Sequence, residues 1–512
     1  MAMNRPRSRP EARRRLCGAV LIGLPVLVSN AWAADGIQVQ PRLSLQTLLT
    51  DNNGLTTNAR DAALVTTLSP GISLASRGGR VVGTLDYSLS GIAYAKSIEP
   101  DRVQQSLRAV AAVDVIEGTL TVDSVASILQ QSASALGTQT IDGNLANPNR
   151  TEIASLSVSP TLRGRLGSLA SVQVRGTASE SRSKGSDLGD TRQGMGSVAL
   201  NGLGGGLVSW YANLTAQQTR YIGHDNRSND VQAWVGLSYR PDVDFSAALH
   251  GGGERSNYLA GSAENSAIFG GSFGWIPSPR TKVSGEWMRH SYGNSHSLNV
   301  EYRMARSALR FSDSQSVNLT PQLSSTSLGS IYDILFLQYA SIEPDPIQRD
   351  QLVRGFLAAN GVNPSTELFG KVLSNAPTIA RSQQLSYSVS GVRTSFVLSA
   401  SRSSTERVGS SSGLEGDLAL FARIVQRGVS AVLTHRLTPS SSISAGYTLS
   451  HNGGDGGSSL LGNDTQLNAA TLSWNGQLAR RTSISLTLRH AQSDGIASYR
   501  ENAASVILTQ LF

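Results

Sequence analysis

Short segments in which apolar and polar residues alternate recur along most of this 512-residue chain. Each segment runs for about ten residues, the length that a tilted β-strand needs to cross a bilayer. Such alternation puts apolar side chains on one face of a strand and polar side chains on the other. The pattern predicts a sheet with one apolar and one polar face. The clearest apolar sets are Leu298, Val300, Tyr302 and Met304; Leu385, Tyr387 and Val389; Ile443, Ala445, Tyr447 and Leu449; and Ile484, Leu486 and Leu488.

The connections between these segments alternate between short and long. Short turns at one end and long loops at the other are typical of outer-membrane barrels, whose short turns are periplasmic. The sequence therefore predicts an all-β fold, a transmembrane antiparallel β-barrel of about 18–22 strands, with 22 as the full count. The short candidates are Arg77–Arg80, Gly164–Gly167, Gly202–Gly206, Pro241–Asp244, Pro277–Thr281, Gly391–Thr394, Thr438–Ser441 and Leu478–Arg481; the long ones are Gln131–Arg150, Ser181–Arg192, Gly252–Glu264, Glu406–Gln426 and His451–Asp464.

Composition agrees with a barrel. Only 39% of the residues are hydrophobic, and a barrel needs apolar residues on one face of each strand only. Intrinsic disorder also has low hydrophobicity, but it does not alternate. A soluble β-helix would show a fixed short repeat, which the chain lacks, and a sandwich rarely needs so many strands. A closed barrel satisfies every backbone hydrogen bond in lipid.

The N-terminus has the form of a cleavable export signal. A basic stretch ending at Arg15 precedes an apolar core, Leu16–Val28, and Ala31-Trp32-Ala33 fits a cleavage site. We expect residues 1–33 to be removed and residues 34–512 to form a single barrel in the outer membrane of a Gram-negative bacterium. The alternative, an inner-membrane anchor, would need about 20 apolar residues.

The same segment accounts for the only cysteine and most of the excess positive charge. Cys17 opens the apolar core, so the mature chain has neither disulfides nor thiol chemistry, and the position does not suit lipidation. Removing the six arginines and Glu11 lowers the formal net charge from +8 to about +3. The charge therefore does not indicate a nucleic-acid partner.

The chain ends in a strand-like run closing on Phe512. A terminal aromatic residue resembles the general signal read by the barrel-assembly machinery, so that machinery and periplasmic chaperones are expected partners. Counting back, the outward set is Gln510, Leu508, Val506 and Ala504. An apolar residue is usual where Gln510 stands, which weakens the signal without removing it.

One insertion, residues 338–382, breaks the alternation. Pro344–Gln348 has the features of a helix start, and Asn360-Gly361 those of a helix end. Between them an apolar stripe at helical spacing must pack on something. Counting seven strands back from the C-terminus places the insertion outside the cell. It packs on its own loop or forms a lid, plug or constriction over the pore. The stripe is Leu352, Val353, Phe356 and Leu357.

Five further segments stand out: Ser330–Ser341, Pro344–Pro346, Val353–Gly361, Gly293–Leu298 and His435–Pro439. With these segments the chain resembles, over most of its mature length, the outer-membrane proteins associated with PEP-CTERM (exosortase) systems. The resemblance implies an outer-membrane barrel that belongs to exopolysaccharide and protein-sorting systems, with exopolysaccharide export components as partners. It supplies no catalytic motif.

Motifs for catalysis or metal binding are weak. The seven histidines form no H-E-x-x-H, and there is no C-x-x-C. Gly409–Gly413 matches G-x-S-x-G literally but lies in a Ser/Gly-rich loop, not at a strand–helix turn. We therefore expect no enzyme, no cofactor and no metal. An outer-membrane hydrolase with its site in the barrel stays the alternative, as does a structural or adhesive surface barrel.

The main functional hypothesis concerns charge inside the barrel. Several charged residues fall on the polar face of their strands, and a basic lining would favour anionic solutes or sugar acids. A structural lattice of paired charges is the alternative. We expect a passive conduit or export pore for exopolysaccharide or related material, in contact with outer-membrane lipid and lipopolysaccharide. The pore-lining candidates are Glu301, Arg303, Arg306, Arg310, Arg436 and Arg489.

Overall fold

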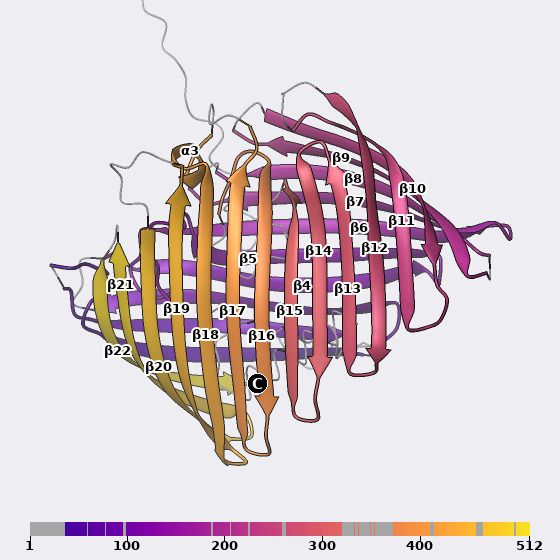
Figure 1. The fold of residues 1–512 in the computed structure, drawn as a ribbon. Helices are drawn as coiled ribbons and strands as arrows, with labels where there is room; N and C mark the ends of the chain where they lie inside the picture. Colours follow the sequence, from indigo (N-terminus) through magenta and orange to yellow (C-terminus); the bar gives the residue numbers. More distant parts are fainter. Residues whose placement is uncertain are drawn as a thin grey trace, which may run out of the picture.

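Antiparallel strands close into one barrel in the computed structural model (Figure 1). The sheet has 22 strands, and each pairs with the strands before and after it in the sequence. The last strand pairs with the first from Arg42↔Leu511 to Thr50↔Ala503, which closes the ring. Closure pairs the backbone of both terminal strands, as lipid requires. The predicted all-β antiparallel barrel and the full count of 22 strands are confirmed; the extracellular helical insertion stays a prediction.

The strands are 10 to 17 residues long. They are β1 (Ile37–Thr50), β2 (Ala63–Ser76), β3 (Val81–Ala95), β4 (Arg102–Ile116), β5 (Leu120–Ser132), β6 (Arg150–Leu166), β7 (Ala170–Ser183), β8 (Thr191–Gly202), β9 (Val208–Tyr221), β10 (Asn226–Tyr239), β11 (Phe245–Ser256), β12 (Glu264–Ser278), β13 (Thr281–His290), β14 (Gly293–Arg303), β15 (Ser307–Asn318), β16 (Thr378–Ser390), β17 (Thr394–Arg407), β18 (Arg423–Thr438), β19 (Ser441–Asp455), β20 (Asp464–Ala479), β21 (Thr482–Gly495) and β22 (Tyr499–Leu511).

The structure describes most of the chain after the predicted signal. Residues 1–35, and with them the predicted cleavage site, lie outside the described ranges, as do Leu352, Phe356 and Leu357 of the predicted stripe. The described residues are 36–58, 60–76, 78–95, 99–185, 188–204, 206–223, 226–258, 263–319, 332, 336, 349, 353, 372–409, 414–456, 464–495 and 498–512.

Every connection at one end of the barrel has five residues or fewer, and all longer connections lie at the opposite end, as predicted; that end also has the two-residue turn 291–292. The turn between β12 and β13 is residues 279–280, whereas the loop between β5 and β6 is residues 133–149. Because the strand number is even, β1 starts and β22 finishes on the same side of the barrel. This is the side with the short turns. We call this the turn end and the other the loop end. Loops are shorter than predicted where strands extend into them, as at residues 184–190.

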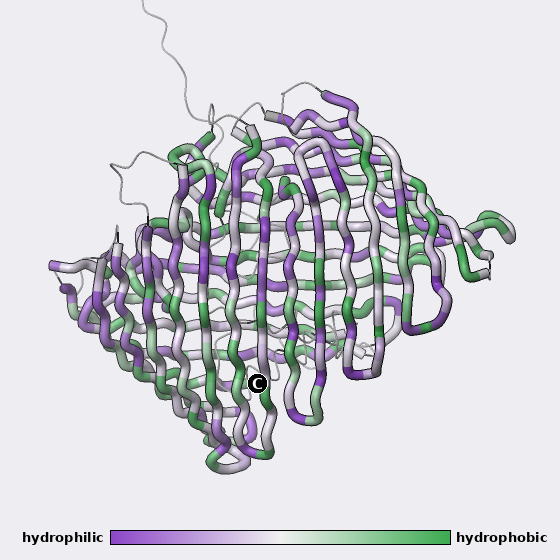
Figure 2. The backbone as a smooth tube through the Cα atoms, viewed as in Figure 1, coloured by the Kyte–Doolittle hydropathy of each residue, from purple (hydrophilic) through white to green (hydrophobic). Residues whose placement is uncertain are grey.

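The two faces of the wall differ in polarity, and hydrophobic and hydrophilic residues alternate along the strands (Figure 2). Large apolar side chains are exposed on the outer face: Leu45 is 43% exposed, Leu68 48%, Val235 65%, Leu249 75% and Leu488 59%. The residues between them face the lumen. The period-2 pattern of the sequence thus translates directly into an apolar outer face and a polar inner face.

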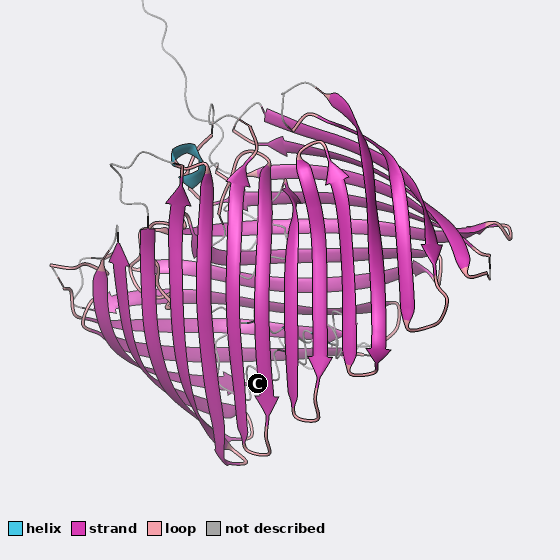
Figure 3. Cartoon of the chain, viewed as in Figure 1, coloured by secondary structure: helices cyan, strands magenta, loops and turns pink. Residues whose placement is uncertain are grey.

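Helix is scarce in the described ranges (Figure 3). The one helix with defined bounds is α3 (Asp417–Leu420), and Tyr332, Phe336, Arg349 and Val353 are also helical. No helix among the described residues is long and apolar enough to span a membrane.

The predicted insertion also ends earlier than expected. Residues 378–382 belong to β16, where Thr378 pairs with Asn318 and Ser382 with Ser314 of β15. In Thr378-Ile379-Ala380-Arg381-Ser382 apolar and polar residues do not alternate, so a search for alternation misses this part of the strand.

Candidate functional site

The inner face carries charges that are paired across strands. Arg42 of β1 reaches over Ser73 of β2 to form a bidentate ion pair with Asp86 of β3, in which Nη2 donates to Oδ1 over 2.8 Å. Ser73 Oγ accepts from Arg42 over 2.9 Å and donates to Asp86 over 2.7 Å. Gly71 leaves room for the guanidinium: a Cβ there would lie 2.9 Å from Arg42 Nε. The arrangement holds three strands together through their inward side chains.

The same arrangement occurs on a second set of strands. Arg175 of β7 reaches over Thr161 of β6 to Asp123 of β5, with Nη1 donating to Asp123 Oδ2 over 3.1 Å and to Thr161 Oγ1 over 3.3 Å. In both places a hydroxyl on the middle strand accepts from the arginine, and that of Ser73 also donates to Asp86. Pairing of this kind neutralises inward charge and favours a structural lattice over a uniformly basic lining.

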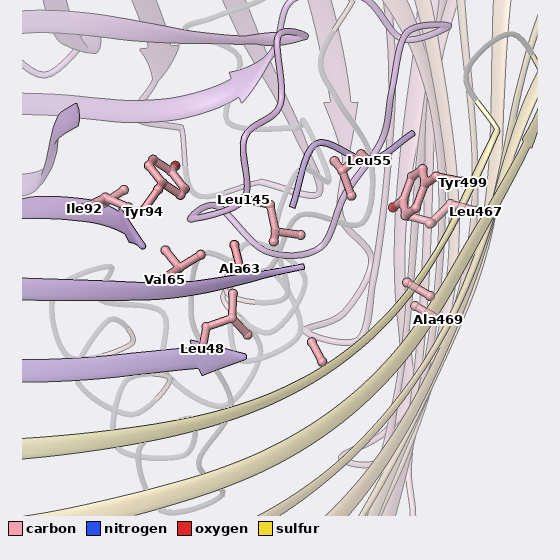
Figure 4. Close-up of a cluster of buried hydrophobic side chains, with 12 residues drawn as sticks. Leu48, Leu55, Ala63, Val65, Ile92, Tyr94, Leu145, Leu467, Ala469 and Tyr499 are labelled. Atoms are coloured by element: carbon pink, nitrogen blue, oxygen red, sulfur yellow. The ribbon is translucent and has the colours of Figure 1, made fainter. Parts of the chain in front are cut away.

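The loop of residues 133–149, between β5 and β6, folds into the barrel from the loop end. Leu145 is fully buried and joins a cluster that contains Leu48, Val65, Tyr94 and Tyr499 (Figure 4). These residues come from both sides of the β1–β22 seam, so the loop packs across the closure of the ring. Burial of a leucine side chain contributes roughly 1.5–3 kcal/mol relative to exposure.

Hydrogen bonds from the wall fix the backbone of this loop. Tyr94 Oη donates to the carbonyl of Asn144 and Tyr499 Oη to that of Gln139, each over 2.7 Å. Arg102 Nη2 donates to the carbonyl of Leu145 over 2.8 Å. The loop therefore occupies part of the lumen in one defined conformation.

Arg489 of β21, a predicted lining residue, anchors the loop. Its guanidinium donates to Asp142 over 2.7 Å and to Glu501 of β22 over 2.7 Å, while Thr50 donates to Glu501 over 3.0 Å. The side chains of Arg489 and Glu501 are 9% and 0% exposed. Burial alone would raise the pKa of Asp142, but the adjacent Arg489 charge holds it below its usual range. Arg489 thus points inward but is covered, and its charge is balanced.

Three described residues of the connection between β15 and β16, namely Tyr332, Phe336 and Arg349, lie inside the barrel; of these, Arg349 belongs to the predicted insertion. The guanidinium of Arg108, on the inner face of β4, lies 4.0 Å from the centre of the Tyr332 ring. Tyr332 stacks on Phe336 at 5.6 Å between centroids, and Arg349 lies 4.7 Å from the Phe336 ring. Arg349 in turn lies within electrostatic range of Arg310 on β15. Since β4 and β15 stand half a ring apart, these contacts cross the lumen.

Val353 is the one described residue of the predicted apolar stripe. It is helical and fully buried.

Of the remaining lining candidates, three lie together on β14 and β15, and Arg306 is the one that is not on a strand. Glu301 and Arg303 of β14 face inward and form an ion pair of 2.6 Å, and Arg310 is opposite Glu301 in register. Arg306 lies in the turn at residues 304–306, where its carbonyl accepts from Ser390 N, and not on a strand. Arg436 is an exposed residue of β18 near the turn end, apart from the others.

A second group of polar residues, missed in the sequence, lies at the loop end of β11, β13 and β14. His290 Nδ1 lies 2.8 Å from Glu254 Oε2, and His290 Nε2 lies 3.0 Å from Ser295 Oγ. Glu254 is fully buried and also accepts from Ser291 N over 2.6 Å. His290 stacks on Tyr292 at 4.7 Å. The spacing of Ser, His and Glu residues gives no signal, because only strand register brings them together.

The other sequence-based expectations concern the ends of the chain and metals. Phe512 is 59% exposed, and its backbone N–H donates to Pro41 O over 3.0 Å, beside the seam between β22 and β1. Leu508 and Val506 are exposed on the outer face, in the predicted outward set. Within the described ranges, no three His, Cys, Asp or Glu side chains are placed to hold a metal ion.

Neither a family model nor a curated protein matches the chain. Among solved structures, the FrpB iron transporter from Neisseria meningitidis is 10% identical with a TM-score of 0.48, over 93% of this chain and 83% of that one. The siderophore receptor PirA from Pseudomonas aeruginosa is 9% identical with a TM-score of 0.43, over 92% and 80%. OccK8 (OprE) from the same species is 11% identical with a TM-score of 0.28, over 93% and 98%. At these TM-scores the likenesses carry no argument about function.

Proposed function

We propose that this protein is an outer-membrane conduit for a polar solute or polymer. The observation that supports it most is a closed 22-strand barrel with an apolar outer face and a polar, charged inner face. Barrels of this size are wide enough to enclose a lumen that other parts of the chain can fill. The predicted export signal and the aromatic C-terminus support the location, with the turn end in the periplasm.

Loop 133–149 is the main described element that narrows this conduit. It is held by Arg489, Tyr94 and Tyr499 and lies across the seam. The contacts of Arg108 with Tyr332 and of Arg349 with Phe336 support a position of the insertion inside the lumen. Its role as a lid or constriction stays a prediction. So does an exopolysaccharide cargo, which rests on the PEP-CTERM resemblance alone.

Conductance of the purified protein in planar bilayers tests the conduit. We expect discrete single-channel steps, and larger steps when residues 137–145 are replaced by a Gly/Ser linker, because that segment fills part of the lumen. Silent membranes with both proteins would contradict a conduit.

Thiol labelling provides a second test, because the only native cysteine lies in the predicted signal. Arg436→Cys puts a thiol on the inner face of β18 near the turn end, whereas Leu433→Cys puts one on the outer face of the same strand, where Leu433 is 46% exposed. A charged, membrane-impermeant reagent added at the loop end should label only the first. If neither cysteine is labelled, water does not pass through the lumen.

A second candidate function follows from Ser295, His290 and Glu254. A serine hydroxyl on one imidazole nitrogen and a carboxylate on the other is the arrangement that activates serine for acyl transfer. Ser295 Oγ would attack an ester carbonyl while His290 Nε2 takes its proton and Glu254 holds the ring. The plain alternative is a hydrogen-bonded group that seals the β13–β14 hairpin. Labelling by a fluorophosphonate, absent in Ser295→Ala, would favour a hydrolase; no labelling of the folded protein would favour the structural role.

A further inference from the structure

Three arginines stand in one row on the outer face, near the loop end of β8, β9 and β10. Arg192 is directly opposite Arg220, and Arg220 is directly opposite Arg227. They lie on the same face as Leu214 and Val235, which are 45% and 65% exposed. Each is one residue from the end of its strand. The row therefore faces outward, at the edge of the apolar face.

Among the described residues, carboxylates balance this row only in part. Arg192 donates to Glu180 over 3.1 Å, but Glu180 also accepts from Arg182 over 2.7 Å. No carboxylate in the part of the chain that the structure describes lies within ion-pair distance of Arg220 or Arg227. Like charges directly opposite in a sheet repel. An anion between the guanidinium groups would turn this repulsion into attraction, since arginine binds phosphate oxygens in a bidentate manner.

The residues below the row change in a regular order towards the turn end. Two positions from the arginines, Gln218 and Asn229 form an outward amide pair, in which Nε2 donates to Oδ1 over 2.9 Å. Two positions further, Ala216 is opposite Val231, which is 45% exposed. At about 3.3 Å per residue, the apolar surface begins about 13 Å below the arginines. Charge, amide and apolar surface follow one another as phosphate, sugar and acyl chain do in a phosphorylated glycolipid.

We propose that Arg220 and Arg227, together with Arg192, bind the phosphate of a phosphorylated glycolipid in the outer leaflet. The amide pair below faces the sugar hydroxyl groups, and the apolar face contacts the acyl chains. A glycolipid is favoured over a simple phospholipid because the amide layer separates the charges from the apolar surface. The proposal rests on the proposed outer-membrane location and orientation, but not on conduction.

Arg402 of β17 and Arg427 of β18 repeat the pairing elsewhere on the ring. They are directly opposite in register and exposed on the outer face. No ion pair to either one occurs among the described residues. This pair lies deeper than the row, since Arg402 is five residues and Arg427 four residues from the loop end of its strand. Opposed outward arginines therefore occur at two places on the surface.

Binding of bis-phosphorylated lipid A to the purified full chain in zwitterionic detergent, followed by native mass spectrometry, tests the proposal. Wild type should bind, and Arg220→Gln/Arg227→Gln should lower the affinity by at least about tenfold. Arg163→Gln/Arg165→Gln, which removes the same charge at the turn end of β6, should bind as wild type does. Lipid A without phosphates should bind both proteins equally weakly.

Three results would overturn the proposal. One is unchanged affinity in Arg220→Gln/Arg227→Gln. The second is equal competition by phosphatidylglycerol, which would indicate a general anionic surface. The third is a change of oligomeric state in the variant with unchanged lipid affinity, which would indicate a contact between copies. Conductance measured on the same variant separates this proposal from the conduit: the variant should conduct as wild type does.

Discussion

Three arginines on the inner face of the barrel and the row on its outer face differ in their nearest charged neighbours. Inside, Arg42, Arg175 and Arg489 each contact a carboxylate from another strand, at 3.1 Å or less. Outside, Arg220 faces an arginine on each side. These three inward charges are therefore balanced within the chain, whereas Arg220 and Arg227 have no carboxylate within ion-pair distance among the described residues. The inner arginines hold the wall and the loop together, and the outer ones are available to bind.

The difference has a physical reason. Loop 133–149 covers Arg489, so an unpaired charge there would be buried, at a cost of several kcal/mol. Arg192 is 62% exposed and reaches polar surroundings, where exposed charges interact by about 1 kcal/mol or less. Only the outer row can therefore keep like charges side by side when no anion is bound.

Removing Arg489 should have the largest effect. Arg489→Met leaves Asp142 and Glu501 without their partner, and breaking a buried ion pair costs about 3–5 kcal/mol. We expect a lower midpoint of urea unfolding in detergent and loss of heat-modifiable migration at a lower temperature. Arg423→Met, which removes an ion pair to Asp455 whose side chains are 47% and 59% exposed, should cost about 1 kcal/mol or less. Equal effects of the two changes would contradict the distinction between the faces.

Gly71→Ala should have the next largest effect. The added Cβ would lie 2.9 Å from Arg42 Nε and 2.9 Å from the carbonyl of Tyr87, so the Arg42–Asp86 pair must shift. Overpacking of this kind costs about 1–3 kcal/mol. Gly194→Ala on β8 is the control, because a Cβ there meets nothing within 4 Å. The urea midpoints should differ in this order; a Gly71→Ala midpoint equal to that of Gly194→Ala would show that the inner lattice yields easily.

Acid should release loop 133–149. The pKa of Asp142 is lower in the fold than its ordinary value of about 3.9. A lowered pKa stabilises the folded state above the ordinary value, and this stabilisation is lost as the pH falls through the folded pKa. Limited proteolysis with an acid-active protease should cut the loop below about pH 4 and leave it intact at pH 5. In Asp142→Asn this pH step should disappear; a step that persists would assign the release to another group.

The sequence predicts the wall far better than the contents of the lumen. Alternation alone gives the strand number and the face of Glu301, Arg303 and Arg310, because parity is a local property. Alternation does not predict that Arg306 lies in a turn, because it does not show that β14 ends at Arg303. Asp142 and Arg489 are 347 residues apart. Their contact depends on ring closure and on a loop that turns inward, and no local pattern encodes either.

The smallest effect should come from the outer row, with the opposite sign. In zwitterionic detergent without lipid A, Arg220→Gln removes repulsion with Arg192 and Arg227, and directly opposed charges are worth about 0.2–1 kcal/mol. The variant should therefore unfold at a slightly higher urea concentration than wild type. High salt should cancel the difference by screening, and added bis-phosphorylated lipid A should reverse it, because only wild type keeps the full row. A variant less stable than wild type in the absence of lipid would mean that the arginines already have partners within the protein, and the contrast between the two faces would then no longer hold.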